Sequence, residues 1–308
     1  MQKFEAKSAI LGWSNWLFVA AIASSWQLAT KVGVSTELTP IDLAVLRYCI
    51  PAVILMPVLW RHGFLPKRGE RGLFLMMVAG AGLPFGLISM AGAAYAPAAH
   101  MGALMPGAMP LFVSLLACMF LGERIPLWKS VGLAAILIGI LSLTGPALLD
   151  GIGGTDDKIW IGHALFLCAG VLWAVYTVAF RCGSYGPWHV AALVCLWSAP
   201  AAILIWLSMP GTRLFAVPLG DFILQALVQG VLAGVAGLAA FGLAIRHLGP
   251  VTASTSGAVV PFLTAFGGVF LLAEALSENT LLALCFTSFG VVLSSGVIDL
   301  RRANTRPS

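Results

Sequence analysis

The sequence predicts an all-α membrane protein of ten transmembrane helices, arranged as two inverted five-helix repeats around a central cavity. Three observations predict this fold: the composition, a regular succession of apolar runs with basic residues on alternate loops, and a similarity between the two halves. Of 308 residues, 60% are hydrophobic and 9% are charged, and the mean hydropathy is +0.97. Soluble domains carry about 25% charged residues, so we expect a lipid bilayer to surround this chain.

Ten apolar runs are each long enough for a helix that crosses a bilayer, which needs about 20 apolar residues. They are roughly residues 10–34, 40–60, 72–94, 97–121, 127–148, 159–181, 187–209, 221–245, 250–273 and 279–299. Short breaks with turn residues or charges separate them. The first run is too long for the apolar part of a cleavable signal peptide, and we therefore expect it to form the first span.

Lys and Arg are distributed unevenly between the two sides that this span count defines. Thirteen of them lie on the side of the chain termini, Arg47 lies within the second run, and the other side carries Lys31, Lys158 and Arg213. Cytoplasmic loops of membrane proteins are enriched in Lys and Arg. We therefore expect both termini in the cytoplasm and the chain in the bacterial inner membrane. The basic residues mark orientation, and no basic patch interleaved with aromatic residues suggests a nucleic-acid partner.

The two halves of the chain resemble each other at two nearly equal offsets. Offsets of 147 and then 151 residues align seven pairs in chain order: Trp26–Trp173, Thr30–Thr177, Pro40–Pro187, Pro110–Pro261, Leu121–Leu272, Glu123–Glu274 and Gly139–Gly290. We place the first repeat at residues 1–150 and the second at 151–308. A unit of five spans is odd, so the second copy is inverted in the membrane. Inverted repeats are typical of secondary transporters, whose substrates bind between the halves near the midplane.

Several segments resemble the drug/metabolite transporter superfamily, specifically its EamA-type ten-helix carriers and, among these, the YddG-like amino-acid exporters. The segments are SSWQLATKV, PIDLAVLRY, VLWAVYTVAFR and the paired endings PLFVSLLACMFLGE (110–123) and PFLTAFGGVFLLAE (261–274). The resemblance implies that spans 1, 3, 4, 6, 8 and 9 line the cavity, with spans 2, 5, 7 and 10 outside them. It also implies that Phe85, Met109 and Trp173 face the cavity, although the YddG-like exporters would carry an aromatic residue where this chain has Met109.

The function that this resemblance implies is export of amino acids, aromatic or large neutral ones included, or of related small metabolites by alternating access. No Asp or Glu lies in the middle of a span expected to line the cavity, and proton-coupled carriers keep such a carboxylate. This favours a facilitator, unless a histidine carries the proton. Export of cationic drugs is the alternative, while a nucleotide sugar would need more basic residues than Arg47. We find no motif of an intramembrane enzyme and expect no cofactor and no metal. The short loops argue against a receptor or scaffold, and a monomer is compatible with the sequence.

The residues that we expect at the cavity are aromatic, histidine, methionine and serine side chains within the spans. They are Trp26, Phe85, His100, Met101, Met109, His163, Trp173, Tyr176, Ser254 and Ser256. Aromatic residues usually gather at membrane interfaces, so the deep ones either pack or line a pocket. The serine hydroxyls either bind a substrate group or bond to carbonyls of their own helix.

Two other groups of intramembrane residues leave a choice open. His100 and His163 lie at similar depth near the outer ends of spans four and six. There they either gain and lose a proton near neutral pH or are satisfied by hydrogen bonds at the membrane interface. The sequence offers no third metal ligand at that depth, so we do not expect them to form a metal site. Arg47 lies roughly 12 Å deep at 1.5 Å per residue. It either binds a substrate carboxylate or pairs with helix-end carbonyls or Asp42.

Prolines and glycines complete the pattern. Pro106, Pro110 and Pro261 lie inside spans four and nine, and because proline removes a backbone N–H we predict hinges there. Two small-x3-small faces, Gly82–Gly86 and Gly230–Gly234, predict close contacts between helices.

Overall fold

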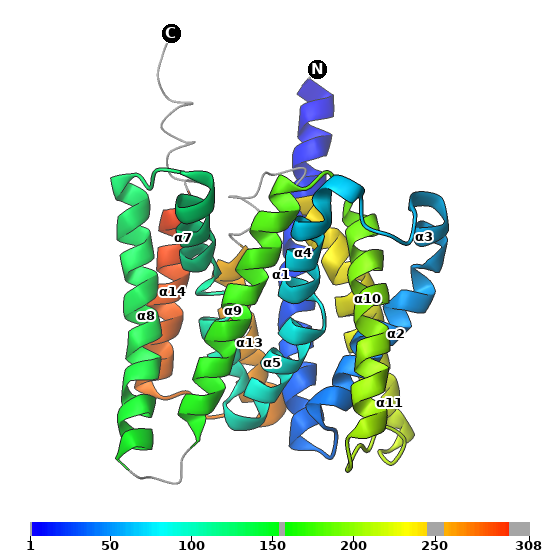
Figure 1. Ribbon diagram of the computed structural model, residues 1–308. Helices are drawn as coiled ribbons and strands as arrows, with labels where there is room; N and C mark the ends of the chain where they lie inside the picture. Colours follow the sequence, from blue (N-terminus) through cyan, green and yellow to red (C-terminus); the bar gives the residue numbers. More distant parts are fainter. Residues whose placement is uncertain (1, 154–157, 245–255, 296–308) are drawn as a thin grey trace.

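The computed structural model of the chain is a bundle of long, roughly antiparallel helices (Figure 1). It describes residues 2–153, 158–244 and 256–295, with side chains from residue 16 onward except that of Ser256. Figure 1 shows the start of α1 and the end of α14 at the same end of the bundle. We call this end the terminal side and the other end the opposite side.

The helices follow one another with short connections. In chain order they are α1 (Gln2–Ser35), α2 (Pro40–Ile54), α3 (Met56–His62), η1 (Arg68–Glu70), α4 (Arg71–Ala81), α5 (Leu83–Tyr95), α6 (Ala98–Leu104), α7 (Met109–Leu121), α8 (Leu127–Ile152), α9 (Ile159–Cys182), α10 (Pro187–Ser208), α11 (Leu219–Gln225), η2 (Ala226–Gly237), α13 (Ser256–Leu272) and α14 (Glu278–Ser294). A further helical stretch at 238–244 continues η2. The described residues contain no strand, so the predicted all-α class is confirmed.

The apolar helices fall in the expected runs, but their lengths differ. Among the described residues, seven helical segments are long and apolar enough to cross a membrane, and α2 with α3 makes an eighth, bent by 54°. The bend lies just after Pro51, the proline inside α2. Two shorter apolar helices, Gly257–Leu272 and Glu278–Ser294, follow where spans nine and ten were expected. The exact count of ten spans therefore stays a prediction.

The two repeats end their fourth spans with the same backbone motif, which supports the duplication. Gly122 after α7 has φ 65°, and Ala273 after α13 has φ 52°. The next N–H groups, of Glu123 and Glu274, each donate to the carbonyl six residues earlier, at 3.3 Å and 3.0 Å. Both ends thus share a left-handed cap residue followed by a hydrogen bond that spans six residues. In Figure 1, α7 ends toward the terminal side and α13 toward the opposite side, as expected of inverted repeats.

The proline-rich stretch of span four interrupts the helix, whereas its counterpart in span nine does not. Helix α6 ends at Leu104 and α7 begins at Met109, with a turn across Met105 to Ala108. Proline at 106 cannot donate the N–H that a continuous helix requires. Helix α13 continues through Pro261 without a break. The break is therefore particular to the first repeat, and the hinge role of the three prolines stays a prediction.

Close glycine contacts hold the helices together, as the small-x3-small pattern predicts. A Cβ atom on Gly230 of η2 would lie 2.8 Å from the Ile50 side chain, and one on Gly234 would overlap Pro51. A Cβ on Gly86 would lie 2.5 Å from the Tyr48 hydroxyl. η2 is a π-helix of 12 residues, a geometry that usually appears as a single wide turn at functional sites. The backbones of η2 and α5 thus approach α2 closely from two directions.

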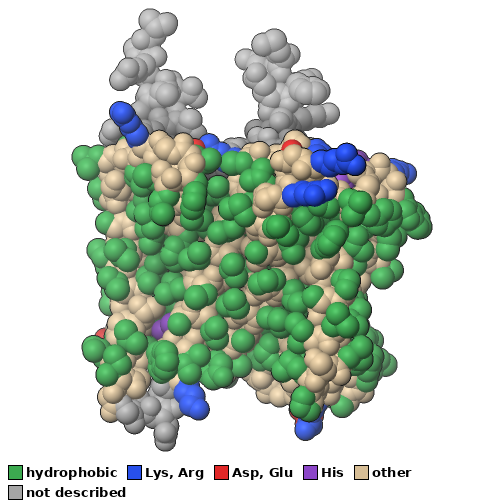
Figure 2. Space-filling model, viewed as in Figure 1, with side chains coloured by type: hydrophobic (Ala, Val, Ile, Leu, Met, Phe, Trp, Pro, Cys, Tyr) green, Lys and Arg blue, Asp and Glu red, His purple; other side chains and the backbone are tan. Residues whose placement is uncertain are grey.

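The surface has the arrangement of a membrane protein. Figure 2 shows apolar side chains over the middle of the visible face, with most of the Lys and Arg side chains at the terminal-side edge and a few at the opposite edge. Large apolar side chains such as Phe270 (70% exposed) and Leu207 (68% exposed) lie on the outside. In a bilayer this surface would contact lipid, so its exposure carries no cost there.

Candidate functional site

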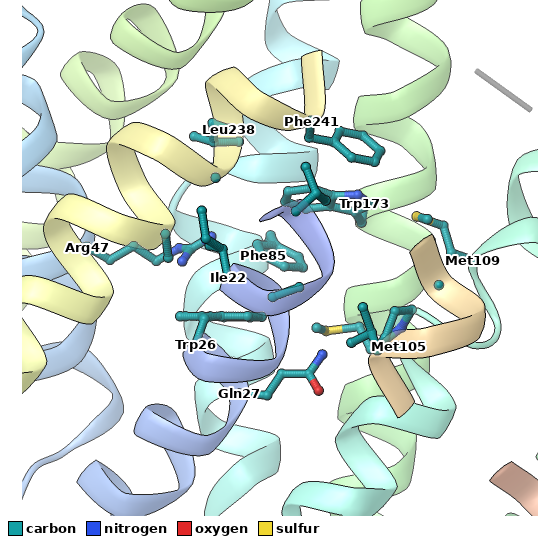
Figure 3. A pocket seen from close by; sticks show the side chains of 17 residues that line it. Ile22, Trp26, Gln27, Arg47, Phe85, Met105, Met109, Trp173, Leu238 and Phe241 are labelled. Atoms are coloured by element: carbon teal, nitrogen blue, oxygen red, sulfur yellow. The ribbon is translucent and has the colours of Figure 1, made fainter. Parts of the chain in front are cut away.

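A cavity of about 100 Å³ lies between the two repeats (Figure 3). The first repeat lines it with Val19, Ile22, Ala23, Trp26, Gln27, Arg47, Phe85, Met105, Pro106 and Met109, and the second with Trp173, Ala233, Gly237, Leu238, Phe241, Gly257 and Val260. Ligand pockets usually measure roughly 300–1,000 Å³. The cavity is therefore smaller than most ligand pockets, and a bound molecule would have to displace flexible side chains such as Met105 and Met109, which adapt easily.

The lining comes from the helices that the resemblance implied, with one addition. Spans 1, 3, 4, 6, 8 and 9 all contribute residues, among them the expected Trp26, Phe85, Met109 and Trp173. The expectation that span two stays outside the lining is wrong, because Arg47 of α2 also lines the cavity. The glycine face of η2 lets α2 approach closely enough for a long side chain to reach the interior.

Four aromatic rings form a continuous wall across the boundary between the repeats. The ring centroids of Trp26 and Phe85 are 5.8 Å apart, those of Phe85 and Trp173 4.9 Å, and those of Trp173 and Phe241 5.6 Å. Such distances suit offset or tilted aromatic pairs. Phe241 lies in the stretch after η2, and Figure 3 shows its ring beside Trp173. The wall is suited to an apolar, flat group.

A buried amide network holds Trp26 in place behind this wall. The Trp26 indole N–H donates to Gln229 Oε1 at 2.8 Å. The Gln229 amide in turn donates to Thr30 Oγ1 at 3.0 Å and to Gln225 Oε1 at 3.2 Å. Gln27 Oε1 accepts from Thr264 Oγ1 at 2.8 Å across the repeats. The Trp26 N–H is therefore already satisfied, and Trp26 offers its ring face to the cavity.

Arg47 is the exceptional side chain of the lining. It is 3% exposed, and its guanidinium carbon lies 4.5 Å from the Trp26 ring centroid and 5.8 Å from that of Phe85. Its Nε and Nη1 atoms are buried without a hydrogen-bond partner in the described part of the chain. Cation–π contact with desolvated rings contributes about 2 kcal/mol, whereas burying an ion costs several kcal/mol. The rings therefore offset only part of the cost of this charge.

Asp42, one partner that the sequence suggested for Arg47, is engaged elsewhere. Its carboxylate accepts from the backbone N–H and hydroxyl of Thr39 at 2.9 and 2.7 Å, which caps the start of α2. It also accepts from the Trp206 indole at 2.8 Å and from the backbone N–H of Arg213 at 3.1 Å. Asp42 thus anchors the opposite-side end of α2, and the structural pairing with Arg47 does not form.

The two histidines come together, but away from the cavity lining. His100 Nδ1 and His163 Nε2 share a hydrogen bond of 2.9 Å, and His100 Nε2 lies 3.1 Å from Thr280 Oγ1. The two histidines, which the span assignment placed at similar depth in the membrane, are therefore in direct contact across the boundary between the repeats. Neither residue is among those that line the cavity.

The same region carries a second link between the repeats. The Glu274 carboxylate of the second repeat accepts from the backbone N–H of Ala98, the first residue of α6, at 2.9 and 3.0 Å. Lys31 donates to the carbonyls of Ala93 and Ala96 nearby, both at 3.0 Å. In spans one, four, six and nine, these linked residues all lie nearer the opposite side than the cavity residues of the same span. Hydrogen bonds thus join the two repeats on the opposite side of the cavity.

The remaining predicted residues take other positions. Met101 and Tyr176 are fully buried but do not belong to the lining, and Tyr176 packs against Trp173 at 5.2 Å between ring centroids. Pro106 lines the cavity, whereas Pro110 and Pro261 are buried outside it. Ser254 and the side chain of Ser256 lie outside the described residues.

Sequence reasoning did not select three residues that belong to this site. Arg47 was open between two roles, and its depth inside a span was the signal. Gln229 and Phe241 carried no motif. Gln229 is nonetheless polar in an apolar run, and such a residue has to find a buried partner, which here is Trp26.

Comparison with known proteins agrees with this architecture. The profile of the EamA-like transporter family matches twice, over residues 11–145 and 160–296. No curated protein matches the chain in sequence. A crystal structure of another protein has the same fold, with a TM-score of 0.64 and 18% identity over 98% of this chain and 99% of that one. Because the two profile matches cover most of its length, the chain belongs to the EamA-like transporter family.

Proposed function

We propose that this transporter exports amino acids with large apolar side chains, or closely related small metabolites. The observation that supports this most is the aromatic wall of Trp26, Phe85, Trp173 and Phe241 in a cavity shared by both repeats. Inverted-repeat carriers bind their cargo at such a boundary. The wall is apolar and continuous, so it favours a flat or bulky side chain over a sugar.

Alternating access is the mechanism that fits this cavity. The bonds of Glu274 with Ala98 and of His100 with Thr280 join the repeats on the opposite side, where they would act as a closed gate. If the terminal side is cytoplasmic, as the Lys and Arg distribution predicts, this conformation is closed toward the outside. Breaking these bonds and forming others at the terminal side would then release cargo outward.

Facilitated transport suits the charges of the site. Among the described residues that line the cavity, Arg47 alone is ionisable, and proton relays in carriers usually use carboxylates or histidines. The same positive charge argues against the alternative of a cationic drug, because a second cation in this desolvated cavity would be repelled.

The test is transport by purified protein in liposomes loaded with single amino acids. We expect L-phenylalanine or L-leucine to leave these vesicles several-fold faster than protein-free ones, and without an imposed proton gradient. If no amino acid crosses faster, the proposed cargo is wrong. If flux requires a proton gradient, the facilitator mechanism is wrong and the cargo class stands.

A further inference from the structure

The guanidinium of Arg47, a residue that lines the cavity, has buried hydrogen-bond donors without a partner among the described residues. Aromatic rings contact it, since its central carbon lies 4.5 Å from the Trp26 ring centroid and 5.9 Å from that of Tyr48. Rings attract a cation through their faces, but they do not accept the in-plane N–H bonds of a guanidinium. Nε and Nη1 have no partner within the described residues. Figure 3 shows the side chain extending toward Trp26 and Phe85.

We propose that Arg47 binds the carboxylate of the transported molecule. This inference rests on the proposed function and defines its cargo more closely: a molecule with one carboxylate attached to an apolar, flat or bulky group. The planar fork of an arginine matches a carboxylate, and hydrogen bonds between two charged groups are the strong ones. A bound carboxylate would supply both the countercharge and the acceptors that Arg47 lacks.

The rest of the lining restricts the cargo further. Besides Arg47, the lining side chains are apolar apart from the Gln27 amide and the two indoles. A second carboxylate on the cargo would therefore find no cation, and a cargo with an amine alone would face the Arg47 charge. An amino acid remains suitable, because Gln27 Oε1 accepts from Thr264 and a carbonyl oxygen has a second lone pair for an ammonium group.

Helix packing positions Arg47 for this role. A Cβ atom on Gly234 would lie 2.8 Å from the Arg47 carbonyl oxygen, and one on Gly230 would lie 2.8 Å from Ile50. Since neither glycine has a side chain, η2 rests on the α2 backbone at Arg47 and on the Ile50 side chain one turn away. The base of the Arg47 side chain is thus fixed by backbone contact, which preorganises its charged end for a ligand.

A purely structural role for Arg47 predicts a different pattern of contacts. A structural buried charge is paired with a carboxylate or bonded to backbone carbonyls. Here Asp42 is engaged by Thr39 and Trp206, and the buried Nε and Nη1 of Arg47 have no hydrogen-bond partner among the described residues. The two roles also differ in their ligand dependence, because only carboxylate binding makes Arg47 sensitive to the chemistry of the cargo.

The experiment compares three probes that share one ring: L-phenylalanine, 3-phenylpropionate without the amine, and phenethylamine without the carboxylate. Binding to the wild-type protein in detergent is measured by thermal stabilisation and by the change in tryptophan fluorescence, since Trp26 adjoins Arg47. We expect both carboxylates to bind and phenethylamine to bind at least about tenfold more weakly. Equal binding of the amine, or no binding of either carboxylate, would overturn the proposal.

Variants then assign the effect to Arg47. We expect Arg47→Gln to weaken carboxylate binding about 10- to 100-fold, with Arg47→Lys retaining part of it. The matched control is Arg213→Gln, because Arg213 is exposed and pairs with Glu37 outside the cavity. If Arg47→Gln does not fold, Arg47→Lys and the wild-type probe series carry the test. Unchanged affinity in a folded Arg47 variant would refute the role of Arg47 and leave the proposed function intact. Carboxylate binding without amino-acid transport would refute the proposed function alone.

Discussion

The carbonyl oxygen of Pro106 lies against Gly257, its counterpart in the second repeat. A Cβ atom on Gly257 would be 2.7 Å from that oxygen, and the offset of 151 residues that aligns Pro110 with Pro261 also aligns these two positions. Both residues line the cavity. Equivalent positions meet at the axis that relates two copies, so this contact marks the centre of the inverted pair.

Gly257→Ala should disturb that centre. The added methyl group meets the backbone of the turn between α6 and α7, which cannot rotate away as a side chain can. We expect overpacking to cost about 1–3 kcal/mol, more than the roughly 1 kcal/mol that alanine adds as a helix former. Thermal unfolding in detergent measures the loss. Gly145→Ala in α8 is the control, since nothing lies within 4 Å of its Cβ position, and equal stability of the two variants would contradict the packing.

Glu274→Gln should loosen the opposite end of the molecule. The carboxylate binds the N–H at the start of α6, where a negative charge is favoured by the helix dipole, and a neutral amide keeps only a weaker bond. Ala96 is 1% exposed. We expect a cysteine placed there to react with a maleimide about tenfold faster in Glu274→Gln than in the parent protein. A tenfold increase corresponds to a loss of ~1.4 kcal/mol in the free energy that keeps this position buried.

That labelling experiment uses a background without the native cysteines. Glu37→Gln serves as its control, because Glu37 makes an exposed ion pair with Arg213 at the same side of the protein. Equal labelling rates for Glu274→Gln and the parent would show that this carboxylate does not hold the closure.

His100→Ala should change the rate of transport more than the affinity for cargo. The substitution removes the bonds to His163 and Thr280, and none of the three residues lines the cavity. We expect the Kd for L-phenylalanine to stay within about twofold of wild type, because binding free energy comes from the lining. A large loss of affinity would instead place His100 at the cargo, which fluorescence titration would detect.

Trp173→Ala should weaken the binding of cargo, in contrast to His100→Ala. Trp173 connects Phe85 with Phe241 in the aromatic wall, and aromatic contacts contribute about 0.5–1.5 kcal/mol beyond the area they bury. We expect the Kd for L-phenylalanine to rise about tenfold or more. Trp188→Ala removes an indole that is 44% exposed on α10 and should leave binding unchanged. Equal titrations of the two variants would exclude Trp173 from the site.

Depth in the membrane was the property that the sequence conveyed best. Lengths of apolar runs and the positions of Lys and Arg determine where each residue lies along the bilayer normal. His100 and His163 were therefore expected at the same depth, and they are in contact. The paired endings at residues 110–123 and 261–274 likewise predicted two equivalent helix ends, and both ends carry the same cap.

Rotation of each helix about its own axis was harder to predict. Arg47 reaches the interior because Gly230 and Gly234 allow η2 and α2 to approach closely, and no pattern in α2 itself indicates this. Met101 and its neighbour His100 were both expected at the cavity, but neither belongs to the lining, and Met101 is fully buried elsewhere. Neighbouring helices determine which face of an apolar helix is inward, so a nearly uniform apolar run gives little information about it.

The π-helical geometry of η2 sets the angular position of everything that follows it in span eight. An α-helix turns through one circle every 3.6 residues, whereas each wide turn of η2 contains an additional residue. Removing one residue from 226–237 would rotate the next stretch by about 100°. Leu238 and Phe241 would then point toward another neighbour, and the aromatic wall would lose its fourth ring. The cavity therefore depends on the number of residues in η2 as well as on their identities, and deletion of one η2 residue other than Ala233 and Gly237 would alter the cavity while leaving every lining side chain present.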